Sequence, residues 1–321
     1  MSGAGLPPVG NTGATLTDSS VEPSVHWLSG TTNHETLRVL EVCTALTGSD
    51  VEVRPRGRLG YARQYVIGGL VVLADGQGPQ AAAMGCHVEA SGVVCEELGL
   101  SRLADLYRHL ELRASRIDLA VDGCPFTPAK VWRAWITGKV RTQVKVSADA
   151  LDDRQWRSGD WRRSATGDTA YLGSPRAQRM ARVYDRRETG TRFELQTRDT
   201  AAAAIAADLL GGDLEVGFGR RLLGHVRAFV DFVGGSDPNV SRRPLLRWWA
   251  KFVRGVEASR VRLTGVRVDT FEAAQAWIEA AVAPTLAVYE ERLGRRAMAD
   301  LLEQGRHRWG VRHMRMATGV S

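Results

Sequence analysis

Three short segments of this 321-residue chain carry side chains that suit chemistry on a phosphodiester backbone. The segment RVYD places Tyr184 after an arginine and before a basic cluster, and RFELQ follows it with Glu194. Upstream, RIDLAVD carries Asp118 and Asp122. A tyrosine hydroxyl can attack phosphorus and hold it as a covalent ester, and paired carboxylates hold hard cations such as Mg²⁺ or Mn²⁺. These residue types therefore favour phosphoryl transfer to a tyrosine.

Each of the three segments alternates polar and apolar residues in the manner of a half-buried strand. In RIDLAVD, Ile117, Leu119 and Val121 fall on one face, whereas Asp118 and Asp122 fall on the other. Taken alone, such an acidic face is an ordinary solvated surface. Only convergence with the other polar strands would make it a site.

The two downstream strands show the same alternation. Arg182 shares a face with Tyr184, and Arg192 shares a face with Glu194. A buried tyrosine with a bonded hydroxyl and a cross-strand salt bridge are the ordinary interpretations, and Glu89 in HVEAS is more simply structural. If these strands are neighbours in an antiparallel sheet, however, their carboxylates, arginines and tyrosine converge on one patch. Such a cluster is costly unless a cation and a phosphate neutralise it.

The composition favours a partner that is nucleic acid or another anionic surface. The formal net charge is +7 and the pI is about 9.6. Only four of the 43 basic residues are lysine, so 39 are arginine, whose planar fork suits phosphate. No apolar run reaches the roughly 20 residues that a membrane span needs. The four cysteines form no C-x-x-C pair and suggest reduced core residues of a cytoplasmic protein.

The chain is expected to be an α+β protein with three parts. Residues 1–23 have no apolar periodicity and suggest a disordered tail. Strands and helices alternate from residue 24 to 235, with a polar loop over 147–168. A Gly-, Ser- and Pro-containing linker then leads into a helical region over 236–321.

The set RIDLAVD, YLGSPRAQRMARVYDRRE and RFELQTR resembles the trans-acting rolling-circle replication initiators, the Rep_trans family. VHWLSGTT, GCHVEASGVVCEELG and VSRRPLLRWWAKFV are similar to its phage and integrative-element branch. The resemblance runs from about residue 25 to 310, and its most specific part is the YxGSxxxxxxxRxYD pattern.

The resemblance implies a metal-dependent enzyme that nicks and rejoins DNA through a 5′-phosphotyrosine. Tyr184 takes the position of the nucleophile, with Arg182 and Arg192 as catalytic partners. Tyr171, in a neighbouring strand, is the alternative nucleophile. The expected ligands of Mg²⁺ or Mn²⁺ are Asp118, Asp122, Glu194 and Glu89. The expected DNA contacts are Arg176, Arg186, Arg187, Arg242, Arg243, Trp248 and Lys251.

The same resemblance implies an antiparallel-sheet nickase core, similar in architecture to the HUH nickases but without a His-x-His motif. Residues 24–235 would form this catalytic domain, and 236–321 a DNA-binding accessory region. The implied partners are origin DNA, single-stranded or cruciform at the nick and duplex at the recognition site, together with a helicase and a second copy in a homodimer. Trp248 and Trp249 lie among cations and would stack on bases, unless one of them packs into the core.

Two residues depart from the family pattern, because Pro175 lies in the GSPR turn and His26 stands where an acidic residue is common. Neither removes a catalytic group, but both leave the DNA contacts open. Three other functions stay open from the sequence. They are a relaxase of an integrative or conjugative element, a non-catalytic regulator that binds origin DNA, and a basic α+β protein with no role on DNA.

Overall fold

The computed structural model describes residues 21–79, 81–144, 159–164, 167–186, 190–214, 217–254 and 278–307, together with 271, 275, 309, 314 and 317. The chain divides into two compact units, Met1–Leu263 and Thr264–Ser321. The division therefore falls after the expected boundary at 235/236. Helix α7 (Arg247–Val253) belongs to the first unit, where its Trp249 side chain is fully buried. Residues 1–20 of the expected tail lie outside the described residues, and the first strand begins at Glu22.

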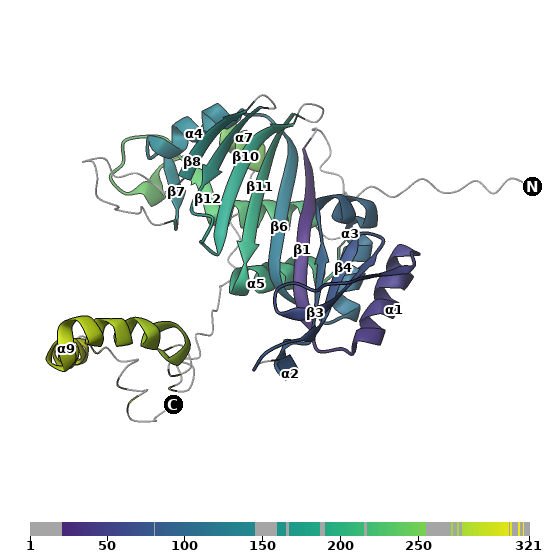
Figure 1. Ribbon diagram of the computed structural model, residues 1–321. Helices are drawn as coiled ribbons and strands as arrows, with labels where there is room; N and C mark the ends of the chain where they lie inside the picture. Colours follow the sequence, from purple (N-terminus) through teal and green to yellow (C-terminus); the bar gives the residue numbers. More distant parts are fainter. Residues whose placement is uncertain are drawn as a thin grey trace, which may run out of the picture. The chain divides into compact units, whose positions relative to one another are not determined.

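The first unit is built on one large antiparallel sheet (Figure 1). Its strands are β1 (Glu22–Thr32), β2 (Val51–Arg54), β3 (Tyr61–Ile67), β4 (Leu70–Gly76), β5 (Cys86–Ala90), β6 (Arg113–Cys124), β8 (Gly159–Ser164), β9 (Gly167–Leu172), β10 (Arg179–Arg186) and β11 (Gly190–Arg198). Their order across the sheet is β2-β3-β4-β5-β1-β6-β11-β10-β9-β8. The strands RIDLAVD, RVYD and RFELQ thus lie side by side, as their predicted convergence required, and the α+β prediction is confirmed.

The helices and the remaining short elements lie between and after these strands. The helices of the first unit are α1 (Thr36–Thr47), α2 (Ala81–Met84), α3 (Gly92–His109), α4 (Pro128–Ile136), α5 (Asp199–Leu210) and α6 (Phe218–Phe229), besides α7. A small second sheet pairs β7 (Val140–Thr142) with β12 (Val230–Phe232), and η1 (Val240–Arg242) precedes α7.

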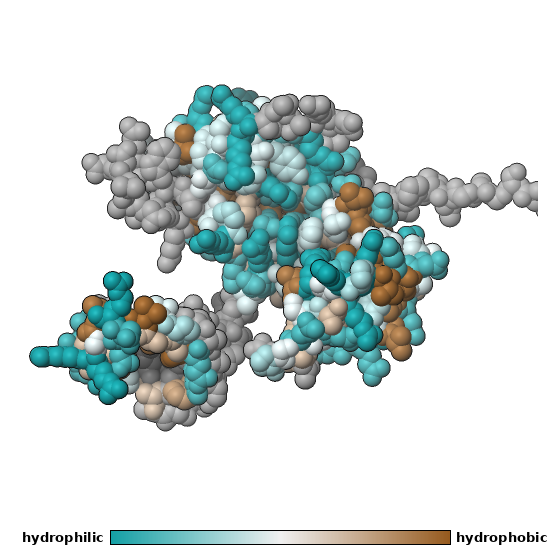
Figure 2. Space-filling view, viewed as in Figure 1, coloured by the Kyte–Doolittle hydropathy of each residue, from teal (hydrophilic) through white to brown (hydrophobic). Residues whose placement is uncertain are grey.

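The apolar face of the large sheet forms the core, as the alternation in RIDLAVD predicted. Ile117, Leu119 and Val121 are fully buried. Helix α7 packs on this face, because the Trp249 ring lies 6.0 Å from the ring of Phe193, which alternates with Glu194 in β11. The opposite, polar face is left for the charged residues. In the view of Figure 2, hydrophilic side chains cover much of β6, β10 and β11.

Three local features complete the description of the first unit. The apolar segment around Gly68 and Gly69 forms a hairpin, because both glycines adopt positive φ (52° and 82°) and turn β3 into β4. Of the polar loop expected over 147–168, residues 147–158 and 165–166 lie outside the described residues, and the rest is not a loop, because 159–164 form β8, a polar edge strand paired with β9. Helix α6 ends at Phe229, where β-branched and aromatic residues continue as β12.

Asp231 in β12 joins the elements on the apolar side of the sheet. Its buried carboxylate accepts hydrogen bonds from Arg227 of α6, Arg141 of β7 and the indole Nε1 of Trp249. Burial alone would raise the pKa of Asp231, but these hydrogen bonds outweigh it and hold the pKa below its usual range. The carboxylate therefore fixes α7 against the core.

The second unit is described from a π-helical turn at Ile278–Val282 into α9 (Ala283–Arg306). Gly294 adopts φ 83° and interrupts the regular helix. In neither unit does a described helix combine the length and the apolar character that a bilayer span requires.

Candidate nicking site on the polar face of the sheet

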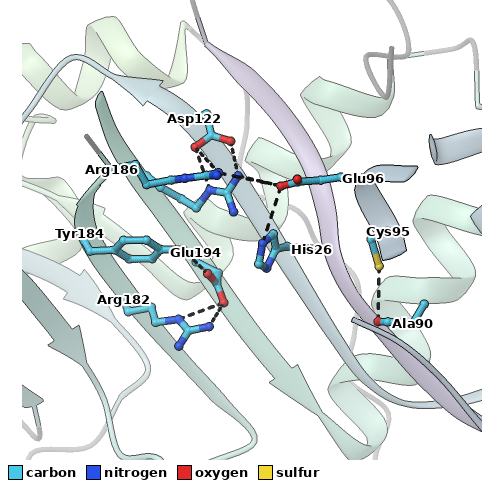
Figure 3. A network of polar contacts seen from close by, with 10 residues as sticks. His26, Ala90, Cys95, Glu96, Asp122, Arg182, Tyr184, Arg186 and Glu194 are labelled. Carbon is cyan, nitrogen blue, oxygen red and sulfur yellow. Dashed lines mark hydrogen bonds and ion pairs between the residues drawn. The ribbon is translucent and has the colours of Figure 1, made fainter. Parts of the chain in front are cut away.

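Tyr184 and Glu194 are diagonal neighbours on the adjacent strands β10 and β11. The antiparallel register pairs Tyr184 with Arg192, and Arg182 with Glu194, so all four side chains lie on the polar face. Tyr184 Oη donates a hydrogen bond of 2.9 Å to Glu194 Oε2 (Figure 3). Arg182 Nε donates to the other carboxylate oxygen, Oε1, also at 2.9 Å. One fully buried carboxylate therefore binds both the tyrosine hydroxyl and an arginine.

The hydroxyl of Tyr184 is held in its protonated form. Burial raises the pKa of Tyr184 to about 12, and the negative charge of Glu194 contributes to the rise. A nucleophilic phenol in this state needs an acceptor for its proton during attack. Glu194 Oε2 already accepts that hydrogen bond, so it is placed to receive the proton.

Arg192 is fixed beside the tyrosine by Asp122. Its guanidinium donates to both carboxylate oxygens of Asp122, from Nε to Oδ1 at 2.8 Å and from Nη2 to Oδ2 at 2.5 Å. Such a two-bond pair sets both position and orientation. Arg186, at the end of β10, lies 3.6 Å from Asp122 Oδ1. Asp122 was predicted to be a metal ligand, and in the structure it anchors two arginines.

Two further residues of this network lie outside the three motif strands. Glu96 comes from α3, and His26 comes from a bulge in β1 (Figure 3). The ring of His26 packs against Gly92, where an added Cβ would approach the ring to 2.4 Å. Burial lowers the pKa of His26, and the charge of Arg192 lowers it further, so the imidazole is largely uncharged at neutral pH.

Asp118 lies on the same face and is almost fully buried. Arg116 donates from Nε to its Oδ1 at 3.0 Å and also binds Oδ2, while stacking over Trp27 at 4.3 Å from the ring centroid. Burial raises the pKa of Asp118 despite these hydrogen bonds, and the negative charge of Glu194 contributes to the rise. Two carboxylates of adjacent strands thus lie near each other.

The four predicted metal ligands do not gather into one cluster. Glu89 lies in β5, separated from β6 by β1, and binds Arg58 and His87. Among the described residues, no three His, Cys, Asp or Glu side chains are arranged to hold a metal ion. Mg²⁺, however, is commonly bound by one or two carboxylates together with substrate phosphates. Asp118 and Glu194 are neighbouring carboxylates that supply oxygen donors of that kind, and in the structure these oxygens accept hydrogen bonds from Arg116, Arg182 and Tyr184.

Of the two predicted DNA contacts of the motif region that the structure describes, Arg176 and Arg186, only Arg186 lies beside Tyr184. Arg186 contacts Asp122, the carboxylate that also binds Arg192 beside Tyr184. Arg176 is exposed in the turn between β9 and β10, and at about 3.3 Å per residue some 17 Å of strand separates the start of β10 from Tyr184. Arg187 lies outside the described residues.

The C-terminal DNA contacts remain predictions, and the structure places them away from the tyrosine. Trp248 packs against Phe126 with ring centroids 5.0 Å apart, and Trp249 is buried, so the core-packing alternative holds for Trp249. Because α7 lies on the apolar face, Trp248 and Lys251 are on the far side of the sheet from Tyr184. The two other predicted contacts, Arg242 and Arg243, precede this helix.

Tyr171, the alternative nucleophile, occupies the same face one strand further out. It pairs with Arg182 in the register of β9 and β10, and Arg162 lies 4.8 Å from its ring centroid. The described contacts of Tyr171 thus include arginines. They include no carboxylate hydrogen bond of the kind that Tyr184 makes with Glu194.

Comparisons with known proteins bear on the family and the fold of the chain. The model of the replication initiation factor family, Rep_trans, matches residues 113–304, which include Asp118, Tyr184 and Glu194. Among solved structures, the rolling circle replication initiator protein from Geobacillus stearothermophilus is similar, with a TM-score of 0.59 and 23% sequence identity over 75% of this chain and 98% of that chain. This similarity shows the fold. None of the curated proteins matches the chain significantly.

Proposed function

The chain belongs to the replication initiation factor family, Rep_trans, and from this premise we propose that it nicks and rejoins origin DNA to start rolling-circle replication. Initiators of this family are nicking enzymes, in general metal-dependent ones. The observation that carries the proposal for this chain is the hydrogen bond from Tyr184 Oη to Glu194 Oε2 between two arginines. It supplies a nucleophile, a proton acceptor and positive charge on one face.

In the proposed reaction, Tyr184 Oη attacks the phosphorus of the scissile phosphodiester. The bond from phosphorus to the 3′ oxygen breaks as the bond to Oη forms, and Glu194 takes the phenolic proton. The 3′ oxygen leaves and takes a proton from water, which yields a free 3′ hydroxyl and a 5′-phosphotyrosine. The ester conserves the energy of the broken bond, so rejoining needs no nucleotide cofactor.

Arg182 and Arg192 stabilise the charge that develops on the phosphoryl oxygens. Each is fixed in advance by a carboxylate, Arg182 by Glu194 and Arg192 by Asp122. Donors that are already oriented need no rearrangement at the moment of reaction, which is the main source of electrostatic stabilisation in enzymes. We assign Asp122 to this positioning role.

The proposal includes a divalent cation, Mg²⁺ or Mn²⁺, held by Asp118 and Glu194. When bound, such a cation polarises the phosphate and neutralises part of its charge. The protein contributes two hard oxygen donors and a sheet that keeps them adjacent. The expected helicase and second copy remain part of the proposal as partners.

The test is formation of a covalent adduct on supercoiled plasmid that carries the DNA flanking this gene. Purified protein is incubated with Mg²⁺ or Mn²⁺, and the products are analysed for relaxation and for SDS-resistant protein–DNA complexes. Metal-dependent adducts of wild-type protein support the proposal. Specific, salt-sensitive binding without any adduct favours the regulator.

A further inference from the structure

Three side chains from three strands converge on a single atom of Glu96. His26 Nε2, Arg186 Nη1 and Arg192 Nη2 lie 3.9, 3.9 and 3.6 Å from Glu96 Oε1. Figure 3 shows the Glu96 carboxylate directed toward His26 and Arg186. Two guanidiniums and an imidazole directed at one oxygen form the arrangement expected around a bound anion.

The contacts that hold Glu96 Oε1 at this point are weak. All three distances exceed the range of direct hydrogen bonds, which ends near 3.2 Å, and the Glu96 side chain is 48% exposed. Exposed ion pairs of this kind contribute little to stability. By contrast, Arg192 binds Asp122 through two direct hydrogen bonds. Glu96 can therefore leave while the arginines stay in place.

The charge balance around this point indicates which group could replace the Glu96 carboxylate. Arg186 and Arg192 against Asp122 leave one positive charge, which Glu96 balances. A phosphodiester carries one negative charge as well, and its oxygens form shorter, stronger bonds with guanidinium groups than Glu96 makes here. The point also adjoins Tyr184, because Arg192 is the cross-strand partner of that tyrosine.

We infer that the point now taken by Glu96 Oε1 is a phosphate subsite, where a backbone phosphate of the DNA strand beside Tyr184 displaces Glu96 and binds Arg186 and Arg192. The Glu96 carboxylate thus occupies the phosphate subsite in the absence of DNA and competes with DNA for it. This inference rests on the proposed function, since it takes DNA as the ligand. It adds the subsite that receives the strand and the residue that opposes binding.

The test measures binding without chemistry. A fluorescent single-stranded oligonucleotide is titrated with full-length protein in the presence of a metal chelator and 0.1 M salt, and the Kd is obtained from anisotropy. The variants are Glu96→Gln, Glu96→Ala and the matched control Glu97→Gln, which loses the same charge from the next, exposed position of α3. Circular dichroism and melting temperature verify that each variant is folded.

Removing the competing charge should tighten binding about three- to tenfold for both Glu96 variants, given one repelling charge within a few ångströms of a phosphate. Glu97→Gln should change the Kd less than twofold. In an Arg186→Gln background, the gain from Glu96→Gln should disappear, since the phosphate then lacks one of its two arginines.

Binding no tighter than that of Glu97→Gln, weaker binding, or a gain that persists without Arg186 would each overturn the inference. Weaker binding would show instead that Glu96 holds Arg192 for the DNA. The outcome is separable from that of the nickase proposal. A gain in affinity with no covalent adduct leaves the subsite and overturns the nickase, whereas a normal adduct with no gain overturns the subsite alone.

Discussion

The hydroxyl of Tyr184 and the carboxylate of Glu194 are joined by a 2.9 Å hydrogen bond between adjacent strands. The pair is diagonal in the register, since Glu194 lies opposite Arg182 and Tyr184 lies opposite Arg192. One carboxylate therefore serves both a tyrosine and an arginine on the same face. An ordinary cross-strand salt bridge would join Glu194 to Arg182 alone and would leave Tyr184 out.

Replacing Glu194 with glutamine should slow adduct formation by about 10²- to 10⁴-fold, the usual contribution of a positioned proton acceptor. The amide keeps the shape but cannot take the phenolic proton. Single-turnover nicking measures the rate, and oligonucleotide binding should stay within about threefold of wild type. Glu97→Gln is the matched control for loss of charge. An unchanged rate in Glu194→Gln would exclude Glu194 as the acceptor.

Asp118 and Asp122 should respond differently to metal. If Asp118 binds the cation, Asp118→Asn should raise the Mg²⁺ concentration needed for half-maximal nicking about tenfold or more. Asp122→Asn frees Arg192 and should slow nicking at every Mg²⁺ concentration without moving that midpoint. Calorimetric titration with Mn²⁺ gives the same comparison without DNA. A midpoint shift in Asp122→Asn only would return the ligand role to Asp122.

Asp231→Asn should destabilise the first unit without touching the site. Loss of the charged hydrogen bonds to Arg141 and Arg227 should lower the free energy of unfolding at pH 7 by about 2–3 kcal/mol. The folded-state pKa of Asp231 is lowered, so its stabilisation is present above the unfolded pKa and is lost as pH falls through the folded value. The difference from wild type should therefore shrink below about pH 4.

Urea denaturation at pH 7 and at acid pH measures this difference. Glu52→Gln is the control, because its ion pair with Arg54 is exposed and should contribute less than about 0.5 kcal/mol. A difference between wild type and Asp231→Asn that grows toward acid pH would contradict the account.

The sequence was sufficient to predict which side chains share a face. Alternation in three strands placed Tyr184 with Arg182 and Glu194 with Arg192, and the structure has each pair on the polar face. It did not predict the register, because a shift of two residues preserves every face while changing every partner. The hydrogen bond between Tyr184 and Glu194 depends on that register.

Residues contributed by tertiary packing were missed. Glu96 reaches the site only because α3 begins at Gly92 against His26, and no local spacing signals that contact. His26 was visible only as a departure from the family pattern. The predicted metal set likewise overlooked the arginines, because counting carboxylates does not reveal that Arg116 and Arg192 bind two of them.

The most direct measurement compares the adduct formed by wild-type protein, Tyr184→Phe and Tyr171→Phe on supercoiled plasmid carrying the flanking DNA. Both variants lose one hydroxyl from the same face, so each controls for the other. The account predicts a metal-dependent, SDS-resistant adduct with wild type and Tyr171→Phe, and none with Tyr184→Phe. An adduct that survives in Tyr184→Phe would contradict it, and loss in Tyr171→Phe alone would move the nucleophile to Tyr171.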